Sequence, residues 1–485
     1  MRNLFTSYLI GGTLLIAAAG APSAYATSFA DDTHLVREIK TANALLGVDY
    51  SPDGKRIATC GLGRDIVIWS VETGKPVLTL KGHTDDVVTV RFSPNGRYLA
   101  SGGVDKKLIL WDAITGDQLR QTTDHTDYVR DVAFSPDSKL VASAGWDGFS
   151  YVWETFSGVR VAALGAKAGG TGGYDKTRTT KGRSANMTSV AFSPDGTELL
   201  TASGDHLIRG WDTQGWQAKY TLTGHDDEVW DARYSPNGRF VVSGAWDNTC
   251  RVWDVRTRQL TYTLPAHISD VWATAFSPDG QLIASGGGDR KVKIWDMATG
   301  GLVEELNGEA HTAEVENLAF SPDGLTLASV SRDGSLKIWR VPTIADRAAA
   351  YVLPLMAKWE KKGEFEKTDE YQSRMANKLK KPQEFRQAFQ TKMLTAYDRT
   401  AAWQRFELGD YNADTEQFQV VSPQFAGRYV LKVSPREAGA VREHFSEAKY
   451  RTPVFELTPD DQISLRTTEV MVNTGTETRA LILSR

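Results

Sequence analysis

Short apolar runs recur along most of the chain and are separated by turn-forming residues. In the block at residues 82–116, alternating apolar positions at Val88, Val90 and Phe92 are followed by apolar runs at 98–100 and 108–110. Pro-Asn-Gly and Thr-Gly turns divide these runs. Alternation with a period of two residues indicates strands that bury one face. The block therefore predicts three short antiparallel strands, with a fourth near residues 118–120.

The block occurs seven times. Aligning its tryptophan gives one copy at each of seven positions, with steps of 42, 42, 58, 42, 42 and 44 residues: Trp69, Trp111, Trp153, Trp211, Trp253, Trp295 and Trp339. A period in the forties indicates a repeat array. One four-stranded sheet cannot hide both faces, whereas sheets stacked radially around an axis bury them. The sequence predicts an all-β seven-bladed β-propeller over residues 33–341.

Three features of the block resemble the WD-repeat propellers: Gly82-His83, Trp111-Asp112 and the Ser-Pro-Asn-Gly turn at 93–96. The resemblance implies that each blade buries a hydrogen-bonded set of His, Ser or Thr, Asp and Trp, which must satisfy one another. Five sets are complete in the sequence: His83, Ser101, Asp105, Trp111; His125, Ser143, Asp147, Trp153; His225, Ser243, Asp247, Trp253; His267, Ser285, Asp289, Trp295; and His311, Ser329, Asp333, Trp339.

Blades 1 and 4 depart from this pattern. Blade 4 has Arg183 at the histidine position, and blade 1 keeps only Thr59 and Trp69. We expect these two blades to be held mainly by packing.

The last repeat has no fourth strand of its own. Residues 34–40 resemble the fourth strand of other repeats, such as residues 301–306. The N-terminal stretch is therefore predicted to complete blade 7 and close the ring, which removes an exposed sheet edge.

After residue 341 the apolar period changes from two to about four residues. Phe385, Phe389, Met393 and Tyr397 define one helix, and a preceding helix from Thr368 is expected to bury Tyr371, Met375 and Leu379. Strand-like segments follow from residue 403. Residues 343–485 are thus predicted to form a smaller α+β domain, to which the sequence assigns no role.

The N-terminus has the form of a secretory signal at residues 1–26. A basic start, a short apolar run and Ala24-Tyr25-Ala26 are typical of a cleavable signal rather than of a membrane span. We expect a periplasmic or secreted protein, and no later stretch approaches the ~20 apolar residues of a spanning helix. Cys60 and Cys250 fall four blades apart, too far for a disulfide, and are expected to be buried free thiols.

An insertion at 165–184 lengthens the step between blades 3 and 4. It is rich in glycine and contains four Lys or Arg before Arg183 against one Asp. It lacks the Gly-Lys-Ser/Thr of a phosphate-binding loop. Two readings remain open, a solvated loop and a basic flap over a binding face.

Composition and motifs predict no catalytic residue, no metal site and no cofactor. The recurring His, Ser and Asp occur with a Trp at fixed register in several blades, whereas a nucleophile must be exposed at one site. A net charge of −4 gives no indication of nucleic-acid binding.

The resemblance also implies a partner-binding face, formed by the loops before the first strand and between the second and third. By register this face carries Arg130, Trp146, Trp230, Trp246, Trp272, Glu316 and Arg332. Because Trp and Arg dominate interface energies, we expect the four indoles to be partly exposed and to bind a protein partner.

The favoured function is a non-catalytic scaffold for protein partners. Two alternatives remain: a glycan-binding or glycan-processing propeller of the cell envelope, since indoles also stack on sugars, and a propeller that targets an activity carried by the C-terminal domain.

Overall fold

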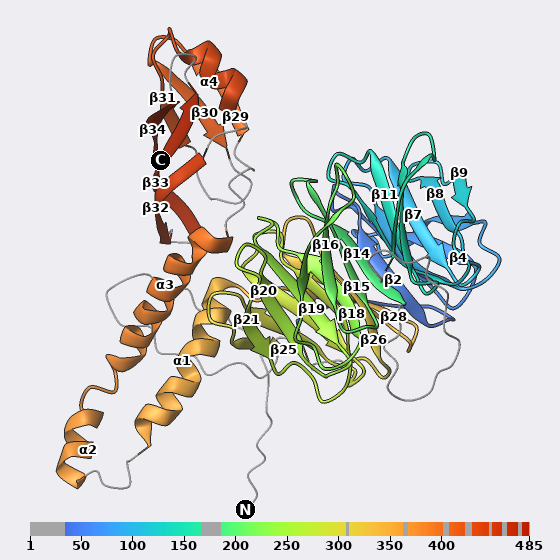
Figure 1. Ribbon diagram of the computed structural model, residues 1–485. Coiled ribbons are helices and arrows are strands. Elements are labelled where there is room, and N and C mark those ends of the chain that lie inside the picture. The colour runs from blue at the N-terminus through green and yellow to red at the C-terminus, as the bar shows by residue number, and fades with distance from the viewer. Residues whose placement is uncertain are drawn as a thin grey trace, which may run out of the picture. The chain divides into compact units, whose positions relative to one another are not determined.

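The computed structural model describes residues 34–165, 186–306, 310–361, 367–400, 407–421, 429–445, 449–457, 463–473 and 478–484. Over these residues it contains seven four-stranded antiparallel sheets followed by a six-stranded sheet (Figure 1). The fold is a seven-bladed β-propeller with a smaller C-terminal domain of helices and one sheet, as the repeats predict. The signal sequence and residues 166–184 of the insertion lie outside the described residues.

Blades 1 to 6 each run through four strands in chain order, from the innermost strand outward, and in blade 7 the outermost strand is β1 from the N-terminal end of the described chain. The first three blades contain β2 (Leu45–Tyr50), β3 (Arg56–Gly61), β4 (Asp65–Ser70) and β5 (Pro76–Lys81); β6 (Val87–Phe92), β7 (Tyr98–Gly103), β8 (Leu108–Asp112) and β9 (Gln118–Thr122); and β10 (Val129–Phe134), β11 (Leu140–Gly145), β12 (Phe149–Glu154) and β13 (Arg160–Gly165). Blades 4 and 5 contain β14 (Met187–Phe192), β15 (Glu198–Ser203), β16 (Ile208–Asp212) and β17 (Ala218–Leu222); and β18 (Val229–Tyr234), β19 (Phe240–Ala245), β20 (Cys250–Asp254) and β21 (Gln259–Leu264). Blades 6 and 7 contain β22 (Val271–Phe276), β23 (Leu282–Gly287), β24 (Val292–Asp296) and β25 (Leu302–Glu305); and β26 (Val315–Phe320), β27 (Thr326–Ser331), β28 (Ser335–Arg340) and β1 (Leu35–Lys40).

The N-terminal strand closes the ring. Strand β1 pairs antiparallel with β28, with Leu35 opposite Trp339 and Lys40 opposite Ser335. The innermost strands contact one another in the order β2, β6, β10, β14, β18, β22 and β26, and β26 contacts β2. The predicted closure of blade 7 by residues 34–40 is confirmed.

The hydrophobic core lies between neighbouring blades rather than within one. Buried residues of β7 and β8 in blade 2 pack with Val129, Val132 and Trp153 of blade 3. Close approach is possible because small residues face the next blade: a Cβ on Gly244 would lie 2.6 Å from Cγ1 of Val271. A larger side chain at that position would push adjacent blades apart.

Buried carboxylates join the innermost strands across blade boundaries. Asp131 accepts a hydrogen bond from the backbone N–H of Val190 at 3.1 Å, and Asp231 accepts one from the backbone N–H of Thr274 at 2.9 Å. Arg233 bridges the two carboxylates at 2.9 and 3.0 Å. Burial raises the pKa of Asp131, but the neighbouring guanidiniums outweigh it and lower that pKa below its usual value.

The C-terminal region has its own core. Its elements are α1 (Ile344–Glu360), α2 (Thr368–Met375), α3 (Lys381–Thr400), β29 (Glu407–Asn412), β30 (Gln417–Val421), β31 (Tyr429–Lys432), α4 (Ala438–His444), β32 (Lys449–Leu457), β33 (Ile463–Asn473) and β34 (Thr478–Ser484). The sheet order is β29-β30-β31-β34-β33-β32. Phe389 and Met393 of α3 are buried against this sheet.

One expectation for this region is wrong. Helix α2 begins at Thr368 but buries none of its residues, and Leu379 is 93% exposed. The sequence pattern did not identify α1, which contacts α3 and contributes Ala348 to the core. Because α1 is the helix that packs against α3, the predicted burial of Tyr371, Met375 and Leu379 does not occur. The side chain of Tyr397 lies outside the described residues.

Cys60 and Cys250 are free and buried, as expected. Burial raises the pKa of the Cys60 thiol to about 12, so it behaves as a small apolar side chain. Among the described helices, none is both long enough and apolar enough to cross a membrane.

Ring closure by β1 generates a stability prediction. Removing residues up to Lys40 should lower the melting temperature far more than removing residues up to Asp32, because only the longer deletion leaves β28 as an open edge. Thermal unfolding of the two truncated proteins measures the difference. Equal melting temperatures would show that β1 does not hold the ring closed.

Candidate functional site

The hydrogen-bonded sets form the framework on which the candidate binding face is built. In blade 2, His83 Nε2 and Ser101 Oγ lie 2.8 Å apart, and Trp111 Nε1 donates to the same hydroxyl at 2.8 Å. His83 Nδ1 lies 3.0 Å from the Asp105 carboxylate. Equivalent contacts join the sets of blades 5, 6 and 7: His225, Ser243, Asp247, Trp253; His267, Ser285, Asp289, Trp295; and His311, Ser329, Asp333, Trp339.

Blade 3 departs from the expected set. His125 contacts Ser143 at 2.6 Å and Asp147 at 2.9 Å, but Trp153 Nε1 donates to Asp124 Oδ2 at 3.3 Å rather than to Ser143. Asp124 stands where blades 2 and 5 have Gly82 and Gly224. Its carboxylate lies within reach of the indole N–H and competes for it with the Ser143 hydroxyl.

Blades 1 and 4 keep the indole bond, and blade 4 also keeps the aspartate, Asp205. Trp69 donates to Thr59 at 2.8 Å, and Trp211 donates to Thr201 at 2.9 Å. In blade 4, Asp205 pairs with Arg209 at 2.5 Å. Asp205 is therefore satisfied by a local ion pair, so this blade is not held by packing alone. Arg183 lies outside the described residues.

Burial lowers the pKa of two of the histidines in these sets, His225 and His311. Burial lowers the pKa of His225, although its bond to Asp247 partly offsets the effect. Burial raises the pKa of Asp247, but the hydrogen bonds from His225 and Thr249 outweigh it and hold that pKa well below the usual range. Both shifts favour a neutral imidazole beside an ionised carboxylate.

The residues of the candidate face form one connected cluster centred on Trp230, which we call the indole cluster. The ring centroids of Trp230 lie 5.0 Å from Trp246 (stacked), 5.7 Å from Trp272 (tilted) and 6.3 Å from Trp146 (edge-on). The guanidinium of Arg130 lies 4.9 Å above the Trp230 ring. The structure thus brings together four indoles from blades 3, 5 and 6.

The remaining two residues join the cluster at its edge. The guanidinium of Arg332 lies 5.2 Å above the Trp272 ring and forms an ion pair with Glu316. The Glu316 side chain is buried, whereas that of Arg332 is 49% exposed. All seven residues that the register placed on this face are therefore linked by contacts.

The prediction that all four indoles are partly exposed is wrong for one of them. Trp146, Trp246 and Trp272 are partly exposed, but Trp230 is only 8% exposed, because three indoles and Arg130 cover it. The indole N–H groups of all four are buried, and in the described part of the chain none has a hydrogen-bond partner. A buried donor without an acceptor is costly, so this cluster is not optimised for folding alone.

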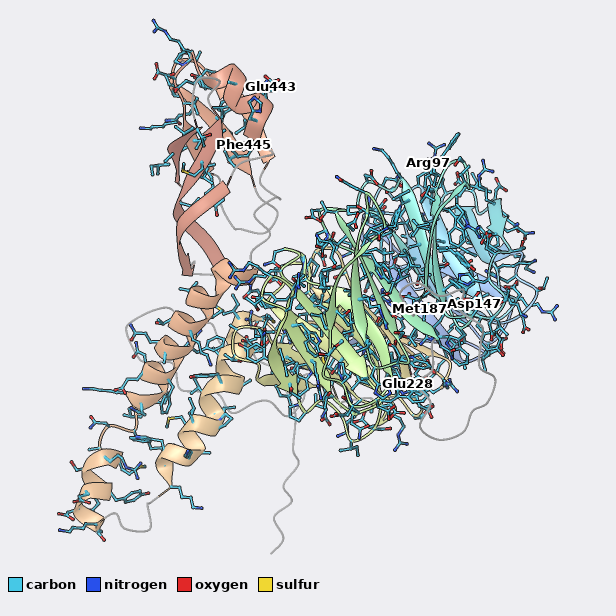
Figure 2. All side chains as sticks on the ribbon, viewed as in Figure 1. Arg97, Asp147, Met187, Glu228, Glu443 and Phe445 are labelled. Carbon is cyan, nitrogen blue, oxygen red and sulfur yellow. The ribbon has the colours of Figure 1, made fainter. Side chains whose placement is uncertain are left out.

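Sequence reasoning did not identify Tyr128 or the carboxylates around the cluster. The Tyr128 ring stacks on Trp146 at 5.3 Å. We call each hydrogen-bonded set of His, Ser or Thr, Asp and Trp a tetrad. Tyr128 is the third residue after a tetrad histidine, and the same position holds an acidic residue in four other blades: Asp86, Glu228, Asp270 and Glu314. Comparing the third residue after the histidine in every repeat would have identified them. Figure 2 shows Glu228 and Arg97 at opposite edges of the propeller.

Backbone hydrogen bonds attach these positions to the face. The N–H of Trp146 donates to the Tyr128 carbonyl at 2.9 Å, and that of Trp246 donates to the Glu228 carbonyl at 3.0 Å. The N–H of Gly288 donates to the Asp270 carbonyl at 2.9 Å. In these three blades, the residue directly before the tetrad Asp is therefore hydrogen-bonded to the third residue after the tetrad His.

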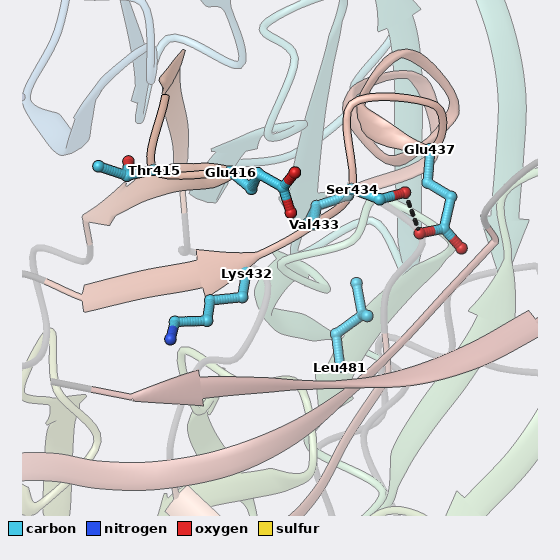
Figure 3. A pocket seen from close by; sticks show the side chains of 7 residues that line it. All are labelled: Thr415, Glu416, Lys432, Val433, Ser434, Glu437 and Leu481. Atoms are coloured by element: carbon cyan, nitrogen blue, oxygen red, sulfur yellow. Dashed lines mark hydrogen bonds between the residues drawn. The ribbon is translucent and has the colours of Figure 1, made fainter. Parts of the chain in front are cut away.

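The C-terminal domain contains a separate pocket. It is lined by Thr415, Glu416, Lys432, Val433, Ser434, Glu437 and Leu481 (Figure 3). In it, Ser434 Oγ donates a hydrogen bond to the Glu437 carboxylate at 2.6 Å, just before α4. Across the described ranges, no group of three His, Cys, Asp or Glu side chains is placed to hold a metal ion.

Comparison with known families gives matches at all seven blades. A family model described as "WD domain, G-beta repeat" matches residues 34–70, 74–112, 116–154, 174–212, 216–254, 258–296 and 302–340. No curated protein matches the chain.

The buried histidines generate a prediction about pH. Because the folded-state pKa of His225 is lowered, the unfolded chain binds the proton more readily, and stability is lost as pH falls below the usual histidine pKa of about 6.5. The melting temperature should therefore fall between about pH 7 and pH 5. A His225→Asn variant should melt at a lower temperature but show a shallower fall. An unchanged slope in His225→Asn would contradict the assignment.

Proposed function

Because the chain belongs to the WD-repeat family, we propose that it is a non-catalytic platform of the periplasm or secreted space that binds protein partners at the indole cluster. Propellers of this family generally mediate interactions between proteins. The cellular location rests on the N-terminal sequence, which has the form of a secretory signal.

One observation carries the proposal: four indoles from three blades meet on the face formed by one set of loops. Residues that dominate binding energy are typically Trp, Tyr and Arg gathered at the centre of an interface. Here Trp146, Trp246 and Trp272 are partly exposed around the buried Trp230, with Arg130 stacked on it. Such a cluster offers a large apolar surface at little cost in side-chain entropy, because its rings already hold one another in place.

The state of the tetrads supports a non-catalytic role for the propeller. Each of the five histidines in the hydrogen-bonded sets is buried and bonded on both sides, as His83 is to Ser101 and Asp105. The serine hydroxyl also accepts from an indole. A nucleophile needs access to substrate, which these hydroxyls lack.

A glycan is a second candidate for the same face. The specific observation is the stacked pair of Tyr128 and Trp146, in which Tyr128 is 37% exposed. Flat, partly exposed rings can pack against the C–H faces of a sugar. A soluble glycan array, read against pull-down from envelope extract, separates this candidate from a protein partner.

The proposal predicts a binding loss for Trp246→Ala. Truncating a hot-spot indole costs about 2 kcal/mol or more of binding free energy, so capture of partners from envelope extract should fall at least about 30-fold in affinity. The matched control is Trp216→Ala, because Trp216 lies in the loop between β16 and β17, at the other end of its blade. Circular dichroism should show both variants folded.

Capture that is the same for the wild type and for Trp246→Ala would remove the binding claim. A loss shared equally by Trp216→Ala would point to a general effect on the propeller instead.

A further inference from the structure

We propose that the indole cluster binds an extended, proline-rich segment of a partner protein. The carbonyl oxygens of that segment accept hydrogen bonds from the indole N–H groups, and its prolines pack on the outer rings. This inference rests on the proposed function, since it names the chemistry of the partner bound at that same face.

The first observation is a set of donors without acceptors. The Nε1 atoms of Trp146, Trp230, Trp246 and Trp272 are buried, and no group in the described part of the chain accepts a hydrogen bond from them. Trp230 as a whole is more than nine-tenths buried. A buried donor that lacks a partner costs free energy, and a ligand that brings an acceptor recovers that cost. The cluster therefore favours a ligand rich in acceptors.

The second observation is that the cluster offers almost no acceptor in return. Of its seven side chains, only Glu316 carries an acceptor, and this carboxylate is buried and forms an ion pair with Arg332. Arg130 and Arg332 carry donors alone. A ligand with many donors would leave them unpaired at this surface. Each proline brings a carbonyl oxygen and no N–H, whereas each hydroxyl of a sugar brings a donor as well.

The third observation is the arrangement of the rings. The position directly before the tetrad Asp alternates over four consecutive blades between an indole and a glycine: Trp146, Gly204, Trp246 and Gly288. At this position no side chain stands between the two indoles. The ring centroid of the buried Trp230 lies 6.3 Å from that of Trp146 and 5.0 Å from that of Trp246. Aromatic rings grouped in this way are the usual surface for proline-rich segments.

The rings do not need a cation from the ligand. The guanidinium of Arg130 lies 4.9 Å from the Trp230 centroid, and that of Arg332 lies 5.2 Å from the Trp272 centroid. The electron-rich faces of these two indoles are thus already matched by positive charge within the chain. The chemistry left to a partner is apolar packing together with hydrogen-bond acceptance.

An exposed apolar side chain borders the cluster in blade 6. A Cβ on Gly288 would lie 3.6 Å from Trp272 Nε1 and 2.8 Å from Ser269 Oγ, so the loop that carries Ser269 runs beside this indole. The preceding residue, Ile268, is 87% exposed. A polyproline II segment rises about 3 Å per residue, so a few residues suffice to extend from the rings to this loop. Such a segment is already extended when free and loses little entropy on binding.

The test uses the full mature protein and two acetylated peptide amides. Hexaproline is titrated against the protein by calorimetry and tryptophan fluorescence. Hexa-alanine is the matched control, because it has as many carbonyl groups but adds an N–H at every residue and lacks the fixed φ of proline. The expected result is saturable binding of hexaproline, with hexa-alanine at least about tenfold weaker.

Variants locate the site and separate the ring from its N–H. Trp246→Ala should weaken hexaproline binding by at least about tenfold. Trp246→Phe keeps a flat ring but removes the donor, and should weaken binding by about three- to tenfold. Trp216→Ala, between β16 and β17 at the other end of its blade, should leave binding unchanged. The comparison of the two peptides needs no variant, so a variant that fails to fold does not decide the outcome.

Two outcomes overturn the inference. One is hexaproline binding no more tightly than hexa-alanine, including the case in which a neutral oligosaccharide, maltoheptaose, binds instead at a site lost in Trp246→Ala. The other is unchanged hexaproline binding in either Trp246 variant, since both the ring and its N–H are assigned to the contact. In either case, capture of partners that still depends on Trp246 would leave the binding face standing. Capture that ignores Trp246 would defeat the proposed function itself.

Discussion

The hydrogen bond from a buried indole to a neighbouring hydroxyl or carboxylate is the constraint on which each blade depends. In six blades the indole of the third strand donates to a Ser or Thr of the second, as Trp253 does to Ser243 at 2.9 Å. The bond fixes the register between the second and third strands. It therefore also fixes the position of the loop that joins them. In blade 5 that loop carries Asp247 and, directly before it, Trp246. This part of the candidate face is therefore positioned by the same contacts that hold the blade.

In the blades that depart from the repeated set, buried polar groups are paired with other residues. Asp124 takes the indole N–H of blade 3, and Arg209 neutralises Asp205 in blade 4. In blade 1, which lacks the histidine and the aspartate, Asp86 of the next blade accepts the N–H of Gly63 at 2.8 Å. A buried polar group that loses one partner acquires another, because leaving it unpaired would be costly. The indole cluster is the exception, with four buried donors that find no acceptor among the described residues.

The sequence predicted the propeller well because its signals are local and repeated. Seven tryptophans in register, the turns and the strand alternation sufficed to place the sheets, and the missing fourth strand of the last repeat identified residues 34–40 as its replacement. The site was predicted less completely. Register showed which residues reach the face, but not that Trp230 would be covered, because this depends on how side chains of three blades meet. The C-terminal domain has no repeat from which its elements could be predicted, and helix α1 was not predicted. Its sequence contains Pro354, which argues against a helix interior.

The central claim is that one set of tryptophans holds the fold and another set binds. The most direct measurement is the free energy of unfolding of two variants, Trp253→Ala and Trp246→Ala, under identical conditions. Trp253 is buried and bonded to Ser243, so its loss should cost about 3 to 5 kcal/mol. Trp246 is partly exposed and its N–H is unpartnered in the described structure, so its loss should cost less than half as much. Equal losses in the two variants would contradict the claim and make the indole cluster part of the folding framework.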